Sequence, residues 1–215
     1  MSDSVRRRWF GVVLIALAVG TMGGVAMGTE EAVYTVEKED GDFQVRRYSA
    51  QVVAEVVVDG TLEEAGNRAF GPLFGYISGA NHAKGKIAMT APVAQRREGE
   101  RIAMTAPVGQ EASGGRWAVT FTMPANSTLE TLPVPADEKV RLRTVPARRM
   151  AAVRYSGTWS RQGYEDHLAQ LRQWMSAAHL VAGGEPVWAR YNAPFTPWFL
   201  RRNEVLVPLA EGAGD

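Results

Sequence analysis

The feature that most constrains the fold of this chain is an internal repeat. Residues 43–61 align without a gap over residues 140–158. The identical positions in the two copies are Arg46 and Arg143, Ala50 and Ala147, Ala54 and Ala151, Val56 and Val153, Gly60 and Gly157, and Thr61 and Thr158. Shared β propensity explains part of this similarity, but the matched Gly-Thr and the helical pattern after it favour a duplicated strand–helix unit. Two such units predict an α+β fold in which one sheet carries both helices on one face.

The first predicted helix begins after the first copy of the repeat. Thr61-Leu62-Glu63-Glu64 has the pattern of a capping box, with Thr61 as the N-cap. Apolar side chains then recur at helical spacing, at Leu62, Ala65, Ala69, Leu73 and Ile77. Gly71-Pro72 is expected to kink or restart the helix, because proline lacks the N–H group that a helix interior uses. Gly79 is expected to end it.

The second predicted helix begins after the second copy, where Thr158 and Ser160 are candidate N-caps. Its apolar positions are Tyr164, Leu168, Leu171, Met175 and Ala178. Gly183-Gly184 is expected to end it. Strands are predicted near residues 33–37, 43–58, 86–93, 101–108, 116–123, 139–155, 186–191 and 203–209, and residues 124–137 are predicted to be an irregular crossing.

The first 29 residues are typical of a signal peptide or an N-terminal membrane anchor. Arg6, Arg7 and Arg8 precede an uncharged apolar stretch from Trp9 to Gly28. At this length the stretch could also span a bilayer as a helix, and both alternatives stay open. The arginines favour an orientation with the domain outside the cytoplasmic membrane, either periplasmic or anchored. Residues 30–210 are then the folded domain, and residues 211–215 are expected to be a disordered tail.

The composition excludes several classes of function. The 215 residues include 24 basic and 23 acidic residues, so the basic excess typical of a nucleic-acid-binding protein is missing. Cysteine is absent, which excludes disulfides, thiol catalysis and thiolate metal sites. The sequence also contains no nucleophile elbow, His-x-x-His pair or phosphate loop. These observations favour a binding protein over an enzyme.

A second, shorter repeat carries a family resemblance. Ile87-Ala-Met-Thr-Ala-Pro-Val93 recurs 15 residues later as residues 102–108, and Glu98-Gly99 between the copies suggests a hairpin turn. With Lys86 before it, this string resembles the SOUL heme-binding family. The resemblance covers residues 34–208 and includes Tyr48, Tyr76-Ile77-Ser78-Gly79, Phe121-Thr-Met-Pro124 and Arg201-Arg202-Asn203-Glu204-Val205.

The resemblance implies both a fold and a ligand. The implied fold is a distorted β-barrel or antiparallel sheet with two helices and pseudo-twofold halves, similar to the effector-binding domains of bacterial regulators. The implied ligand is heme or another tetrapyrrole. Some members ligate heme through a histidine before the tyrosine that matches Tyr48, but this chain has Arg47 at that position. The resemblance therefore favours the other mode of the family, an apolar groove without an axial protein ligand.

The candidate ligand-contacting residues follow from this mode. Phe70, Leu73, Phe74 and Ile77 are candidates for lining an apolar slot, with core packing as the alternative role. Basic groups would bind the heme propionates, and the candidates are Arg47, Lys84 and Lys86, each of which could instead be a surface cation. Met89 is a further candidate contact with core packing as its alternative, and His82 is the candidate metal ligand, or an exposed loop histidine.

Three functions remain in view. The first is non-enzymatic binding of heme or another tetrapyrrole, as a carrier, buffer or sensor outside the cytoplasmic membrane. The second is hydrolysis or binding of another hydrophobic small molecule. The third is a membrane-linked interaction module without a small ligand, with residues 9–28 as the membrane contact if they are not cleaved. No nucleic-acid partner is expected, and the sequence identifies no protein partner.

Overall fold

The structure, a computed structural model, describes residues 30–83 and 99–210. Its strands are β1 (Glu30–Glu31), β2 (Tyr34–Asp40), β3 (Phe43–Tyr48), β4 (Gln51–Val58), β5 (Asn81–His82), β6 (Thr105–Ala106), β7 (Val108–Ser113), β8 (Arg116–Thr122), β9 (Val134–Pro135), β10 (Arg141–Val145), β11 (Arg148–Tyr155), β12 (Val187–Arg190) and β13 (Asn203–Pro208). The helices are α1 (Leu62–Ile77), α2 (Arg161–Ala177) and the 3₁₀ helix η1 (Trp198–Leu200). The predicted leader, tail and strand at 86–93 lie outside the described residues.

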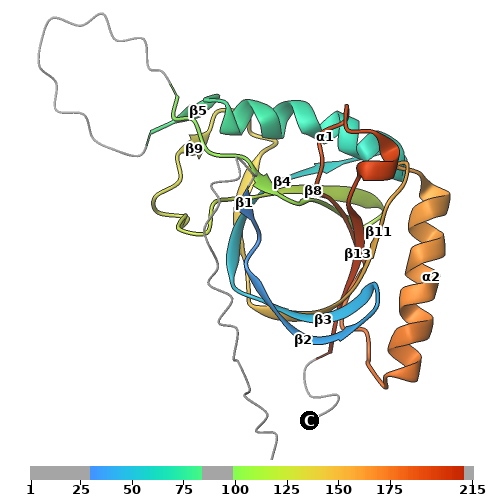
Figure 1. Ribbon diagram of the computed structural model, residues 1–215. Coiled ribbons are helices and arrows are strands. Elements are labelled where there is room, and N and C mark those ends of the chain that lie inside the picture. The colour runs from blue at the N-terminus through green and yellow to red at the C-terminus, as the bar shows by residue number, and fades with distance from the viewer. Residues whose placement is uncertain (1–29, 84–98, 211–215) are drawn as a thin grey trace, which may run out of the picture.

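Nine of the strands form one antiparallel sheet in the order β10-β4-β8-β7-β12-β13-β11-β3-β2. The sheet curls into a half-barrel, and both helices lie on its outer face (Figure 1). Helix α1 packs on β4, β8 and β7, and α2 packs on β11 and β13. The predicted α+β class, with two helices on one face of a single sheet, is confirmed.

The strand register preserves the predicted repeat. Tyr48 of β3 lies opposite Arg148 of β11, and the aligned positions Val145 of β10 and Gln51 of β4 also lie opposite each other. The strands β3 and β10 are thus exchanged, because each pairs with the second strand of the other copy. This exchange joins the two halves into one sheet and gives the fold its pseudo-twofold symmetry.

Each helix covers its own hydrophobic core. Under α1 the buried residues include Ala54, Val56, Leu73 and Phe121, and under α2 they include Leu171 and others from β11 and β13. Strand residues alternate between these outer clusters and the inner face of the half-barrel, as the period of two requires. A third, smaller cluster lies on the inner face and contains Ala32, Tyr48, Met150, Ala152, Val187, Ala189 and Leu206.

The start of α1 is confirmed, but the helix does not restart at Pro72. The hydroxyl of Thr61 accepts a hydrogen bond from the Glu64 N–H, and the Glu64 carboxylate accepts one from the Thr61 N–H, which completes the capping box. The helix continues through Pro72 to Ile77 as one element. Buried apolar residues lie on both sides of Pro72, so their packing outweighs the one backbone hydrogen bond that proline removes.

Two other boundaries differ from the sequence-based expectation. Helix α2 begins after the Ser160 N-cap as predicted, but it ends at Ala177 rather than at Gly183-Gly184. His179 takes the left-handed conformation that stops it, with φ 56°. The strand expected at 101–108 begins only at Thr105, and β7 extends to Ser113.

Within residues 30–83 and 99–210, no helix is long and apolar enough to cross a membrane.

Candidate functional site

The exposed face of α1 carries a stacked pair of aromatic rings. Phe70 and Phe74 are one helical turn apart, their ring centroids are 5.5 Å apart, and their planes differ by 10°. The two side chains are 39% and 47% exposed. Phe70 also contacts the edge of the Phe121 ring at 5.8 Å, which joins the pair to the core under the helix. The pair is therefore a fixed apolar platform open to a ligand.

The other two predicted slot residues serve the core. Leu73 and Ile77 lie on the side of α1 that faces the sheet and are buried in the cluster with Phe121. The apolar pattern of the helix thus divides into two roles. Leu73 and Ile77 hold the helix on the sheet, and only the two phenylalanines reach the surface.

The chain beyond α1 returns to the C-terminal end of the helix. The buried Asn81 side chain donates hydrogen bonds to the carbonyls of Tyr76 and Glu100, both at 2.8 Å, and accepts one from the Glu100 N–H at 2.9 Å. Ile102 N–H donates to the Ile77 carbonyl at 2.8 Å. Ala83 and Gly99, the described residues on either side of the segment 84–98, therefore lie near the C-terminal end of α1. Lys84, Lys86 and Met89 belong to this segment and lie outside the described residues.

His82 is exposed on the short strand β5, where it pairs with Val134 of β9. Of the candidate polar groups in the described residues, it is the one near the C-terminal end of α1. Residues 30–83 and 99–210 contain no group of three or more histidine, cysteine or acidic side chains that could hold a metal ion. The prediction that His82 contacts a metal stays open.

The structure does not bring Arg47 to the aromatic pair. Arg47 lies on β3, near the edge of the sheet formed by β2, and its guanidinium is 2.7 Å from the Glu37 carboxylate. Helix α1 packs on the opposite half of the same sheet. Arg47 is exposed and paired with Glu37. Because it lies on the other half of the sheet, it is apart from the other candidate ligand contacts.

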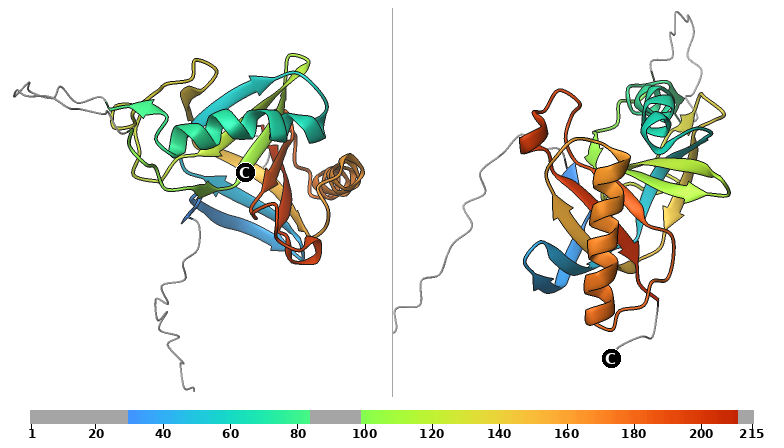
Figure 2. Two further views of the ribbon diagram at one scale, coloured as in Figure 1. Left: turned by 90° about the horizontal axis from the view of Figure 1, so that it is seen from above. Right: turned by 90° about the vertical axis from the view of Figure 1, so that its right-hand side faces the viewer.

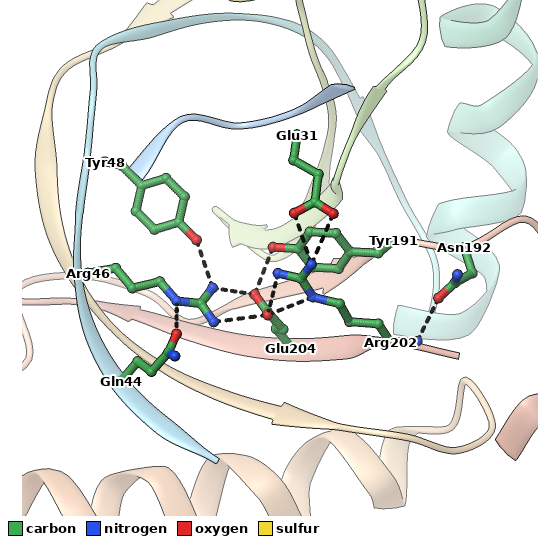
Figure 3. A network of polar contacts seen from close by, with 8 residues as sticks. All are labelled: Glu31, Gln44, Arg46, Tyr48, Tyr191, Asn192, Arg202 and Glu204. Carbon is green, nitrogen blue, oxygen red and sulfur yellow. Dashed lines mark hydrogen bonds and ion pairs between the residues drawn. The ribbon is translucent and has the colours of Figure 1, made fainter. Parts of the chain in front are cut away.

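The inner face holds a buried ion pair that sequence reasoning did not identify as a site (Figure 3). Arg46 of β3 donates two hydrogen bonds to the Glu204 carboxylate of β13, at 2.6 and 3.0 Å. The two side chains are only 2% and 0% exposed. Arg46 also donates to the Tyr48 hydroxyl at 3.1 Å and to the Gln44 amide oxygen at 2.7 Å. Such a two-point contact fixes the position of both charges.

Glu204 has a second arginine partner. Arg202 donates to Glu204 at 3.0 Å and to the Glu31 carboxylate at 2.9 and 3.0 Å, so it bridges β13 and β1. The Tyr191 hydroxyl donates to Glu204 at 2.7 Å. Burial alone would raise the pKa of Glu204, but the hydrogen bonds and charges of Arg46, Arg202 and Tyr191 together hold its pKa below the ordinary glutamate value. The Glu204 carboxylate is therefore ionised, and both of its oxygens accept hydrogen bonds.

A second group of charges lies further along the inner face. Arg143 of β10 pairs with Glu55 of β4 at 2.7 Å. Burial raises the pKa of Glu111 on β7, and the positive charges of Arg148 and Arg143 offset that rise only in part. Burial also lowers the pKa of Arg148, and Glu111 counteracts this shift. The inner face therefore carries both charged groups and the small apolar cluster around Tyr48 and Met150.

Two hollows open at one rim of the half-barrel, with volumes of about 250 Å³ and 220 Å³. They share Ala50, Gln51, Met123 and Ala125 in their lining. Sites for small ligands usually enclose about 300–1,000 Å³ and are largely apolar. Both volumes lie below this range.

The sequence and the fold both match known proteins. A family model described as SOUL heme-binding protein matches residues 29–208. The structure is similar to the C-terminal domain of EcmrR, with a TM-score of 0.56, 9% identity, and coverage of 83% of this chain and 98% of that domain. It is also similar to a hydrolase from Listeria innocua, with a TM-score of 0.54, 14% identity, and coverage of 79% and 92%.

These likenesses to solved structures extend to the fold alone, because the identities are low. The fold is similar to that of the EcmrR C-terminal domain, in line with the α+β fold that the sequence predicted. No curated relative matches the sequence.

Proposed function

The chain belongs to the SOUL heme-binding protein family, and we propose that it binds heme or another tetrapyrrole on the outer face of α1. The observation that carries this proposal is the stacked Phe70–Phe74 pair, which presents two parallel rings to solvent. A porphyrin is a large flat aromatic ligand, so it gains contact area by lying against rings that are already held in position.

The polar end of the ligand would lie beyond the C-terminal end of α1. The described chain stops at Ala83 and resumes at Gly99 near this end, and the sequence between them contains Lys84 and Lys86, the candidate cations for the two propionates. His82 precedes them and is exposed, so it is the candidate axial ligand in the described residues. We infer that binding rests mainly on the apolar platform and the lysines, with His82 and Met89 as further contacts.

We propose a non-enzymatic role, as a carrier, buffer or sensor. The motifs of common hydrolases are absent from the sequence, and the likeness to a hydrolase from Listeria innocua rests on 14% identity. The basic residues and apolar stretch of the first 28 residues support a location outside the cytoplasmic membrane, either periplasmic or anchored.

The proposal is tested by titrating hemin into a soluble version that starts at residue 30, after circular dichroism has verified its fold. The expected result is a change of the Soret band that saturates near one equivalent. The variant Phe70→Ala with Phe74→Gln should weaken it, and Val181→Ser, which removes an exposed apolar side chain at the end of α2, is the matched control. A change that never saturates, or that both variants share, would contradict a specific site on α1.

The lysines are tested in the same assay. Lys84→Ala with Lys86→Ala should raise the dissociation constant for hemin and leave the circular dichroism spectrum unchanged, because propionate contacts would be lost without a change in the core. Arg47→Ala is the matched control, since Arg47 pairs with Glu37 away from α1. Equal effects of the lysine and arginine variants would indicate a general charge effect instead of propionate binding.

A further inference from the structure

The loop between β12 and β13 exposes the most apolar surface of the described residues. Its side chains Phe195, Leu200, Trp198 and Phe199 are 90%, 64%, 59% and 58% exposed. Figure 2 shows the turn that carries η1 projecting beyond the sheet. Contiguous exposed apolar groups of this kind mark an interaction surface, because leaving them in water is unfavourable.

The backbone of this loop is held by its own hydrogen bonds. Arg201 folds back and donates to the carbonyls of Pro194 at 2.8 Å and Thr196 at 2.7 Å. Further carbonyls accept backbone hydrogen bonds: Ala193 from Thr196, Pro197 from Leu200, and Trp198 from Arg201 and Gly157. The loop therefore turns much of its polar backbone inward and its apolar side chains outward. This arrangement suits a non-aqueous surface, where unpaired backbone groups are costly.

The loop also lies where the chain enters the domain. Arg202, two residues after Leu200, binds Glu31 through two hydrogen bonds at 2.9 and 3.0 Å (Figure 3). The described chain begins at Glu30, and the uncharged apolar stretch from Trp9 to Gly28 immediately precedes it in the sequence. A bilayer that contains this stretch would therefore lie beside the exposed loop.

We propose that the loop Ala193–Leu200 docks into the interfacial region of a lipid bilayer. Tryptophan is enriched in this region, and tryptophan, phenylalanine and leucine form the apolar face of protein segments that lie in it. Both nearby arginines are already engaged, Arg201 by loop carbonyls and Arg202 by two carboxylates. The attachment therefore depends on apolar contact and changes little with salt. It orients the domain so that the membrane covers this loop, and it does not depend on the proposed tetrapyrrole site.

The experiment uses the full chain, whose lack of cysteine allows labelling at a single introduced thiol. Phe195→Cys and Val181→Cys are labelled separately with an environment-sensitive dye, and each protein is reconstituted into phosphatidylcholine vesicles that contain some brominated lipid. Val181 is the matched control because it is an exposed apolar side chain just beyond the end of α2 at Ala177, outside the loop Ala193–Leu200.

The proposal expects a blue shift and loss of emission for the label at residue 195 but not at residue 181, at both low and high salt. Adding Trp198→Ser and Phe199→Ser should restore the emission at residue 195 while the circular dichroism spectrum stays unchanged. Equal quenching at both sites would mean that residues 9–28 alone bring the domain to the lipid, and this would overturn the proposal. Quenching at neither site would overturn it as well and would leave the loop to a protein partner.

Discussion

The two halves of the molecule share a topology but differ in what they expose. Counted from the N-caps Thr61 and Ser160, the positions of Phe70 and Phe74 in α1 correspond to Ala169 and Gln173 in α2. All four positions are exposed, yet only α1 presents aromatic rings. The buried positions of both helices remain apolar because each must cover its own part of the sheet. Both halves thus share the same packing, while the helix of only one half carries a pair of exposed aromatic rings on its outer face.

The aligned arginines of the repeat show a second difference. Arg46 is 2% exposed and pairs with Glu204, whereas the side chains of Arg143 and its partner Glu55 are 42% and 16% exposed. Arg46 lies on β3, inside the sheet, and its side chain is covered by the network of Tyr48, Glu204 and Arg202. Arg143 lies on β10, which is an edge strand of the sheet. The arginine at this repeat position is therefore buried in one half of the molecule and partly exposed to solvent in the other.

Removing the buried carboxylate should have the largest effect on stability. Glu204→Gln leaves the Arg46 and Arg202 charges without their shared partner, and we expect a loss of about 3–5 kcal/mol in the free energy of unfolding. Urea denaturation followed by circular dichroism measures it. A loss below that of Glu55→Gln would mean that the two halves do not differ as their burial indicates.

The same pair should make the domain sensitive to acid. The folded-state pKa of Glu204 is lowered, so its stabilising contribution is present above the pKa of the unfolded chain and is lost as pH falls through the folded-state value. We expect the wild-type free energy of unfolding to fall as pH drops below about 4, the ordinary glutamate range. Glu204→Gln should flatten this part of the profile, and parallel profiles would exclude Glu204 as the cause.

Exchanging the exposed residues of the two helices tests the ligand side of the comparison. Phe70→Ala with Phe74→Gln gives α1 the residues of α2, and we expect a weakening of hemin binding of about tenfold or more, because two rings would lose their contact with the ligand. The dissociation constant from the Soret titration is the measurement. Unchanged affinity would place the tetrapyrrole elsewhere on the molecule.

The two N-caps allow a finer comparison. Thr61 forms a reciprocal capping box with Glu64, whereas Ser160 accepts one hydrogen bond from the Gly163 N–H. Thr61→Ala and Ser160→Ala should each cost about 1 kcal/mol, with the larger loss at Thr61 because Glu64 also loses its ordered partner. Thermal unfolding of both variants gives the order, and a larger loss at Ser160 would contradict it.

The smallest effect is expected at the partly solvated pair. Glu55→Gln should lower the free energy of unfolding by about 1 kcal/mol or less, since water reaches the Arg143 guanidinium and stabilises it when its partner is removed. High salt should reduce the difference between this variant and the wild type. A loss as large as that of Glu204→Gln would show that the inner face is drier at this end than the exposed fractions indicate.

Much of the fold could be predicted from neighbouring residues in the sequence. The capping box at Thr61 and the apolar positions of both helices depend on short-range spacing, and all are present. The repeat correctly predicted two strand–helix units in one sheet. The break at Pro72 was expected from local chemistry alone and did not occur, because buried side chains on both sides of the proline hold α1 together.

The candidate site could be predicted only in part. Periodicity placed Phe70, Leu73, Phe74 and Ile77 together on one helix, but it could not show which of them faces solvent. The Arg201-Arg202-Asn203-Glu204 string is part of the family resemblance, and its local sequence predicts no site. Its partner Arg46 is 158 residues away in the chain, so no local pattern joins the two.

The sequence by itself therefore determined the fold class, the duplicated unit, the helix start sites and the family, because these depend on local propensity, spacing and motif. The tertiary structure decided the exchange of β3 and β10 and the burial of Arg46 with Glu204. It also decided that the Phe70–Phe74 pair and the loop Ala193–Leu200 are exposed. The physical reason is that burial and pairing depend on which distant strands meet when the sheet curls. A side chain's role as core, ion pair or binding surface is settled only by those contacts.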